Sequence, residues 1–200
     1  MRKFVVTLAL SVLASACTTS APTPDLAPSD LKSEPDYQAV IAKHTLFFRK
    51  YDGFHESFRA HATLLTPETR DAITKQRAKY LEWDSQKIQA EKDRSVQEMS
   101  TQAQFFLQLY TPEVDYNDLG KYNSIWKIYL VIDGHRFEGK VVKAHGKPIE
   151  FQAIYPQYDS FSRPYLLTFN VATSDVIRHD VKLVMASTLG DAEFNFPAAP

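Results

Sequence analysis

The hydrophobic pattern of the chain changes its period near residue 100, and this change restricts the fold more than any other feature. Before it, apolar side chains recur every three or four residues, as on one face of an α-helix. After it, apolar and polar residues alternate over short segments, as in β-strands, and five of the six glycines lie there. Because helical and strand patterns are segregated along the chain, the sequence predicts an α+β fold.

Two antiparallel helices are expected to form a helical hairpin over residues 36–100. The first would end near residue 65, and its apolar face would consist of Ile41, His44, Phe48, Tyr51, His55, Phe58, Ala62 and Leu65. Thr66 and Pro67 are typical of a helix start, so a second helix is expected from Pro67 to about Ser95. Oppositely charged residues four positions apart describe its solvated face: Asp71 with Lys75, Lys87 with Glu91, and Arg94 with Glu98.

Seven short strands are expected between residues 101 and 197. They cover Gln104–Tyr110, Ile125–Ile132, Arg136–Lys143, Ile149–Tyr155, Tyr165–Val171, Val181–Ser187 and Ala192–Phe196. Asp133-Gly134 is a strong signal for a two-residue hairpin loop. The pattern predicts that the helical hairpin is followed by an antiparallel seven-stranded β-sandwich, immunoglobulin-like in architecture. The alternative is a single curved antiparallel sheet packed on the helices.

The first 17 residues have the pattern of an export signal. Arg2 and Lys3 precede an uncharged apolar run from Phe4 to Ala14, and small residues then lead to Cys17. A run of this length is typical of a signal-peptide core, whereas a helix that crosses a bilayer needs about 20 apolar residues. Cys17 is the only cysteine, so no intramolecular disulfide can stabilise the fold.

The segment Leu13-Ala14-Ser15-Ala16-Cys17 resembles the lipobox of bacterial lipoproteins, in which small residues precede an obligatory cysteine. The resemblance covers residues 1–17 and departs from the usual pattern, because Ala rather than Leu stands three places before the cysteine. It implies removal of residues 1–16 and attachment of lipid to Cys17. Thr18, rather than Asp, follows the cysteine, which in such lipoproteins implies the outer membrane, with the folded part in the periplasm or at the surface. The alternative is an ordinary secretory signal cleaved after Ala16.

Residues 17–35 are expected to form a lipidated, flexible tether. The segment is rich in Pro, Ser, Thr and Ala and buries too little apolar surface to fold; its length corresponds to a reach of at most about 60 Å. The formal net charge is −1 for the chain and becomes −3 without residues 1–16, which carry Arg2 and Lys3. A charge this close to neutral argues against a nucleic-acid partner, which requires a basic stripe.

Catalytic motifs are missing from the sequence: it has no G-x-S-x-G, no H-E-x-x-H and no P-loop, and no cofactor is expected. One polar loop, from residue 111 to 123, carries a candidate calcium site at Glu113, Asp115, Asn117 and Asp118. The EF-hand pattern fails because Trp126 occupies place 12, counted from Asp115, where a carboxylate is obligatory. The simpler interpretation is a turn, since loops favour Asp, Asn and Gly.

Four aromatic residues lie within eleven positions of the chain: Tyr155, Tyr158, Phe161 and Tyr165. Such a group can contact a protein partner or stack on a glycan, and the alternative is packing in the core or at a corner of the β-sheet. A small basic turn, formed by Lys143, His145 and Lys147, is explained by a surface hairpin.

These observations predict a membrane-anchored envelope lipoprotein whose folded part has a non-catalytic role in protein interaction or assembly. A protein of the cell envelope is its expected partner. The second hypothesis is a glycan-binding module that faces peptidoglycan, and it rests on the aromatic cluster. The third is an enzyme with an unrecognised site built from scattered acidic residues and histidines.

Overall fold

A computed structural model describes residues 35–199 of the chain. The helices within this range are α1 (Pro35–Lys43), α2 (Pro67–Leu81), α3 (Ser85–Thr101), the 3-10 helix η2 (Val114–Tyr116), α4 (Pro148–Ile154) and α5 (Thr173–Arg178). The strands are β1 (Thr45–Asp52), β2 (His55–Leu64), β3 (Ala103–Tyr110), β4 (Lys127–Ile132), β5 (His135–Glu138), β6 (Lys140–Lys143), β7 (Arg163–Phe169), β8 (Val181–Ser187) and β9 (Gly190–Phe196). Helices and strands are therefore interspersed along the described chain.

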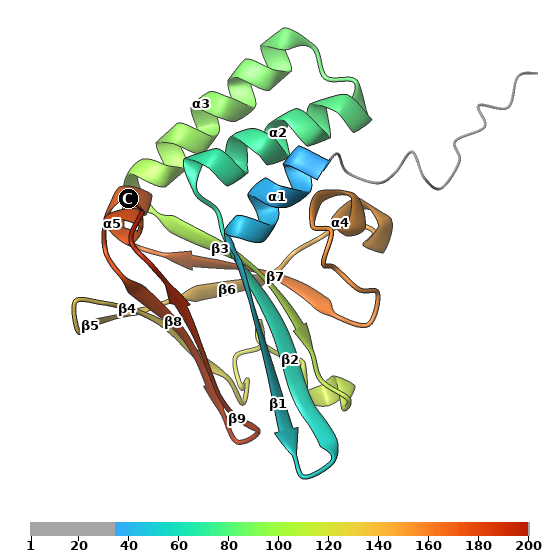
Figure 1. Ribbon diagram of the computed structural model, residues 1–200, viewed down its shortest axis with the longest axis vertical. Coiled ribbons are helices and arrows are strands. Elements are labelled where there is room, and N and C mark those ends of the chain that lie inside the picture. The colour runs from blue at the N-terminus through green and yellow to red at the C-terminus, as the bar shows by residue number, and fades with distance from the viewer. Residues whose placement is uncertain (1–34, 200) are drawn as a thin grey trace, which may run out of the picture.

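The nine strands of residues 35–199 form two antiparallel sheets (Figure 1). The larger sheet has the order β1-β2-β3-β7-β6, and the smaller has the order β5-β4-β8-β9. The edge strands β1 and β9 contact each other on one side of the molecule. On the other side the chain passes from the smaller sheet to the larger one at Gly139. A Cβ atom at Gly139 would lie 2.7 Å from the Phe169 ring, so this crossing needs glycine.

The main core fills the space between the two sheets. It takes alternate residues from β2, β3 and β7 of the larger sheet and from β4, β8 and β9 of the smaller one. Aromatic contacts join the two layers: Phe58 lies edge-on to Trp126 with ring centroids 5.0 Å apart, and Phe105 packs on Phe196 at 5.3 Å. Because the chain has a single cysteine and can form no internal disulfide, burial of this apolar surface is the main source of its stability.

A second core lies on the outer face of the larger sheet. Residues from the sheet, α1, α2 and the region around α4 share it: Tyr37, Ile41, Leu65, Ile73, Phe106, Ile154, Tyr155 and Tyr158. Figure 1 shows α1, α2 and α3 grouped at one end of the sheets. Because β3 has a core on each face, seven of its eight residues are buried.

The predicted N-terminal helical hairpin is wrong, because residues 45–64 form a β-hairpin. β1 and β2 pair around a two-residue loop, Gly53-Phe54, in which Gly53 has a φ of +58°. Every second residue of β2 from Phe58 to Leu64 is buried in the main core. The residues that fitted a helical spacing are therefore divided among the two strands and, for Ile41, the short helix α1, while His44 and Leu65 lie in the connections.

The predicted second helix begins where expected and is then interrupted. Thr66 caps α2 and Pro67 occupies its first turn, which confirms the predicted start. The helix ends at Leu81, because Glu82 adopts a left-handed φ of 49°. Asp84 then caps α3 as a separate helix.

The predicted seven-stranded, immunoglobulin-like sandwich is also wrong. The segment expected as a strand at 149–155 is helix α4 and the residue after it, and the expected strand at 136–143 is divided between the two sheets at Gly139. The alternative of one curved sheet fails because the strands form two sheets. The α+β class holds, and so does the hairpin at Asp133-Gly134, where both residues have positive φ values of 48° and 79°.

Candidate functional site

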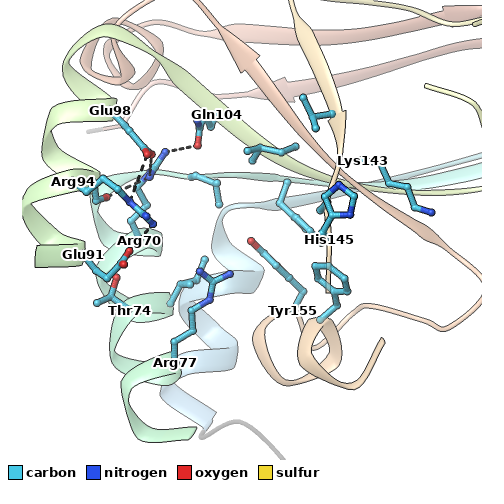
Figure 2. A pocket seen from close by; sticks show the side chains of 18 residues that line it. Arg70, Thr74, Arg77, Glu91, Arg94, Glu98, Gln104, Lys143, His145 and Tyr155 are labelled. Atoms are coloured by element: carbon cyan, nitrogen blue, oxygen red, sulfur yellow. Dashed lines mark hydrogen bonds and ion pairs between the residues drawn. The ribbon is translucent and has the colours of Figure 1, made fainter. Parts of the chain in front are cut away.

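A groove of about 480 Å³ lies between the α2–α3 pair and the outer face of the larger sheet (Figure 2). Its volume is within the range of ligand sites in proteins. The residues that line it come from α2, α3, the strands β3, β6 and β7, and α4 with its flanking residues: Leu65, Arg70, Ile73, Thr74, Arg77, Glu91, Arg94, Ser95, Glu98, Gln104, Phe106, Val142, Lys143, Ala144, His145, Phe151, Tyr155 and Leu166. Segments far apart in the sequence therefore build one site.

The floor of the groove is an apolar row that crosses three strands. Phe106 of β3 is in register with Leu166 of β7, and Leu166 is in register with Val142 of β6. In an antiparallel sheet, residues paired in this way point to the same face and lie side by side. Val142 at the open end of the row is 45% exposed, so part of this apolar floor faces solvent.

One face of α2 forms the first wall. Arg70, Ile73 and Arg77 are spaced by three and four residues, which places them on the same side of the helix. Ile73 packs into the second core, and the two arginines flank it. Figure 2 shows the Arg70 and Arg77 side chains on the groove side of α2.

Two of the arginines have ion-pair partners: Arg70 of α2 pairs with Glu98 of α3, and Arg94 pairs with Glu91 within α3, while Arg70 Nε is buried without a partner among the described residues. Arg70 lies 3.0 Å from Glu98 and donates a hydrogen bond of 2.7 Å to the Gln104 side chain. Arg94 lies 2.5 Å from Glu91. Glu91 also accepts a hydrogen bond from Lys87, and that bond is the main reason why its pKa is lowered. The lowered pKa keeps Glu91 ionised, and both Glu91 and Glu98 are occupied by their partners.

The remaining basic residues of the groove have no such partner among the residues that line it. Figure 2 draws no hydrogen bond or ion pair from Arg77, Lys143 or His145 to the other residues that line the groove. The lining has four permanent cations and two carboxylates, a formal charge of +2. An open groove with an apolar floor and uncompensated positive charge attracts a ligand that is both apolar and anionic.

Tyr155 forms part of the opposite wall. It follows α4 directly, is 5% exposed, and stacks on Phe106 with ring centroids 3.5 Å apart and an angle of 3° between the planes. Burial raises the pKa of its hydroxyl, and the positive charges of Arg77 and Arg70 act in the opposite direction. Tyr155 is thus a neutral hydrogen-bond donor close to two guanidinium groups.

The other aromatic residues of the predicted cluster do not join Tyr155 in one exposed platform. Tyr158 and Tyr165 are buried, at 7% and 2% exposed, whereas Phe161 is 79% exposed. The Tyr158 hydroxyl donates to the Ser162 carbonyl oxygen at 3.0 Å, and Tyr165 points into the main core. Of the four, Tyr155 alone lines the groove.

The loop predicted as a calcium candidate uses its polar side chains to hold itself in place. The Asn117 amide donates to the Leu109 carbonyl oxygen at 2.6 Å and lies 2.9 Å from the Tyr165 hydroxyl. Asp118 accepts a hydrogen bond from Ser124 at 2.8 Å, while Asp115 is exposed. Among residues 35–199, no three His, Cys, Asp or Glu side chains are grouped to hold a metal ion.

The predicted relation of the protein to a membrane depends on Cys17 and on the character of its helices. Cys17, the predicted lipidation site, lies outside the described residues. Within the described part of the chain, none of the helices combines the length and apolar character needed to cross a membrane. Comparison with protein families, curated proteins and solved structures finds no match to this chain.

The arginines of the groove were not among the predicted site residues. The charge-rich segment from Lys75 to Arg94 was interpreted as a solvated helix face, and its i,i+4 pairs are indeed present, as Lys75 with Asp71 shows at 2.7 Å. A usable signal existed, because Arg70 and Arg77 stand three and four residues from Ile73, on the apolar side of the predicted helix.

Proposed function

We propose that this protein is a lipid-anchored, non-catalytic binding protein of the bacterial envelope. Its groove receives a negatively charged, partly apolar segment of a partner protein. The observation that supports this most directly is that the apolar row Phe106–Leu166–Val142 lines the same groove as the unpaired cation Arg77. The anchor at Cys17 and the outer membrane address come from the lipobox resemblance and from Thr18, and they remain part of the proposal.

The composition of the groove favours a protein segment over an acyl chain. Ten of its 18 lining residues are polar or charged, whereas sites for apolar small molecules are lined mostly by apolar side chains. Protein interfaces combine an apolar centre with a polar rim. The groove has this arrangement, with charged residues of α2 and α3 along one side of the floor.

Photo-crosslinking in intact cells tests the proposal. A benzophenone amino acid replaces Val142 on the groove floor or, as a control, the exposed Tyr122 outside the groove. We expect the probe at 142 to give a protein adduct whose crosslinked peptide contains Asp or Glu, and we expect Arg77→Glu to abolish it. An adduct that is equally strong at 122, or that survives Arg77→Glu, would contradict the proposed function.

A further inference from the structure

One hydroxyl in the groove is positioned to contact a ligand. Tyr155 is only 5% exposed, and its ring is held by stacking on Phe106 of the sheet. Figure 2 shows its oxygen pointing toward the space between α4 and α2. No residue of the described chain accepts a hydrogen bond from this hydroxyl, in contrast to Tyr37, which donates to the Ile154 carbonyl oxygen. The hydroxyl oxygen is not among the fully buried unpaired atoms of residues 35–199, so it can be reached from the groove.

Arg77 is the cation near this hydroxyl that has no ion-pair partner among residues 35–199. Arg70 is held by Glu98 and Gln104, and Arg94 is held by Glu91. Arg77 lies one helical turn beyond Ile73 on the same face of α2, and Figure 2 draws it with no partner among the lining residues. Its guanidinium therefore offers a free pair of N–H donors next to the Tyr155 hydroxyl.

We infer that Arg77 and Tyr155 form a carboxylate-recognition site, which binds one Asp or Glu side chain of the partner segment. A neighbouring apolar side chain of that segment packs on Leu166 and Val142. This inference rests on the proposed function and names the chemistry that the groove selects. The guanidinium can donate two parallel hydrogen bonds to a carboxylate, and the phenol can donate a third.

The charge of the site favours a carboxylate over a phosphate. Arg77 contributes a single positive charge that forms no ion pair with the described residues, although Glu91 lies within its electrostatic reach, whereas Arg70 and Arg94 already pair with carboxylates. One guanidinium balances the single negative charge of Asp or Glu, whereas a phosphate group carries nearly two at neutral pH. A Gln side chain in the same place has no charge. Only its amide oxygen can accept hydrogen bonds from Arg77 and Tyr155, because its amide nitrogen is itself a donor.

A pair of matched peptides tests the inference on the full chain embedded in nanodiscs of phosphatidylcholine. Both peptides are acetylated and amidated and carry a leucine and, two residues later, either glutamate or glutamine. Saturation-transfer NMR titrations give the dissociation constants. We expect the glutamate peptide to bind about tenfold more tightly, as hydrogen bonds to a charged group allow. Arg77→Gln and Tyr155→Phe should each reduce this preference to threefold or less.

Lys75→Gln is the control variant. It removes a positive charge from the same helix, but Lys75 lies outside the groove and pairs with Asp71, so the preference for glutamate should stay near tenfold. All variants must retain the circular dichroism spectrum of the parent chain. A preference that is unchanged in Arg77→Gln and Tyr155→Phe overturns the inference.

Two further arms separate this inference from the proposed function. If both peptides bind equally and Val142→Trp abolishes their binding, the groove is a binding site but carboxylate recognition is refuted. If neither peptide binds, or if binding survives Val142→Trp, the proposed function fails as well. Decanoate tests whether the ligand is instead a lipid anion. If decanoate binds more tightly than the glutamate peptide and its binding depends on Arg77, the ligand is a lipid anion and the assignment to a peptide is overturned.

Discussion

At the scale of single residues, Gln108 is the least satisfied side chain on the outer face of the larger sheet. It is 1% exposed, and neither its amide nitrogen nor its amide oxygen has a hydrogen-bond partner among the described residues. Burial of an unpaired amide costs free energy. We therefore expect Gln108→Met, which keeps the shape of the side chain, to raise the free energy of unfolding by about 1 kcal/mol in urea titrations.

Gln104 provides the matched control for this change. It lies on the same face of β3, but its side chain accepts a hydrogen bond from Arg70 at 2.7 Å. Gln104→Met should therefore lower the free energy of unfolding, because it leaves a partly buried guanidinium without this partner. A lower stability for Gln108→Met as well would show that the amide of Gln108 is satisfied in solution.

His61 is expected to make the fold sensitive to mild acid. Burial lowers its pKa below the ordinary value of 6.5; Arg59 and Arg49 lower it further, while Asp159 opposes them. Because the unfolded chain binds a proton more readily than the folded one, the free energy of unfolding should fall as the pH drops from about 6.5 through the lower folded pKa. Urea titrations between pH 7.5 and pH 5 measure this slope.

The contribution of His61 to that slope is isolated by substitution. His61→Gln removes the titrating group, so the stability of the variant should change less between pH 7.5 and pH 5 than that of the parent. His145 is exposed, and His145→Gln should leave the slope unaltered. Equal slopes for the parent and His61→Gln would mean that other groups carry the pH dependence.

At the scale of elements, α3 is the helix that the core holds least. None of its 17 residues is buried, and its contacts are with α2, α5 and one end of β3. β3, by contrast, is buried on both faces. We expect the amide protons of α3 to exchange with solvent much faster than those of β3 in hydrogen-exchange mass spectrometry, because local opening of α3 exposes little apolar surface.

The N-cap of α3 makes this expectation quantitative. Asp84 accepts a hydrogen bond of 2.7 Å from the Lys87 amide, and loss of such a cap costs about 1 kcal/mol. Asp84→Ala should therefore speed exchange in the first turns of α3 by about fivefold. Exchange in β3 should not change, and an equal increase in both elements would indicate global rather than local opening.

The same dipeptide signal explains both a correct and a wrong prediction of a hairpin. Asp133-Gly134 was interpreted as a hairpin loop, and the structure has β4 and β5 around it. Asp52-Gly53 is the same dipeptide at the end of β1, where Gly53 opens the two-residue loop to β2, but a run of helical spacings outweighed it. Periodicity alone could not decide, because the alternation in β2 is only clear beyond Phe58, where each inner side chain meets the smaller sheet.

Helix α4 shows how local capping overrides alternation. Ile149, Phe151 and Tyr155 fit a strand pattern, yet Pro148 stands in the first turn and the Glu150 carboxylate accepts a hydrogen bond from the Lys147 amide at 3.2 Å. Both are helix-start signals present in the sequence. The helical conformation places Phe151 and Tyr155 one turn apart, so that both rings reach Phe106.

At the scale of the whole molecule, the groove could be predicted only in part. Tyr155 was selected from the sequence as a contact residue, and its place in the groove follows from α4. Arg77 and the floor residue Val142 come from segments about 65 positions apart, and no local pattern states that they meet. Their proximity depends on the sheet order β3-β7-β6 and on the placement of α2 over it, which are non-local features.

The proposed anchor at Cys17 would determine where this groove operates, and it can be tested on the whole molecule in a Gram-negative host. A diacylglycerol thioether plus an N-acyl chain binds a bilayer essentially irreversibly, because each buried CH₂ contributes about 0.8 kcal/mol. The parent chain should therefore sediment with membranes and resist extraction by salt and carbonate. Cys17→Ser, which cannot form the thioether, should lose this resistance, as immunoblots of the two fractions would show.

The residue after the cysteine tests the address of the anchored protein separately. Thr18 permits transfer to the outer membrane in the proposed scheme, whereas Thr18→Asp should retain the lipidated chain at the inner membrane, and sucrose-gradient fractions distinguish the two. Thr18→Ser is the control and should behave as the parent. If the Cys17→Ser chain stays membrane-bound through carbonate washing, the proposed lipid anchor is refuted. The reason to seek the acidic partner in the envelope is then lost as well.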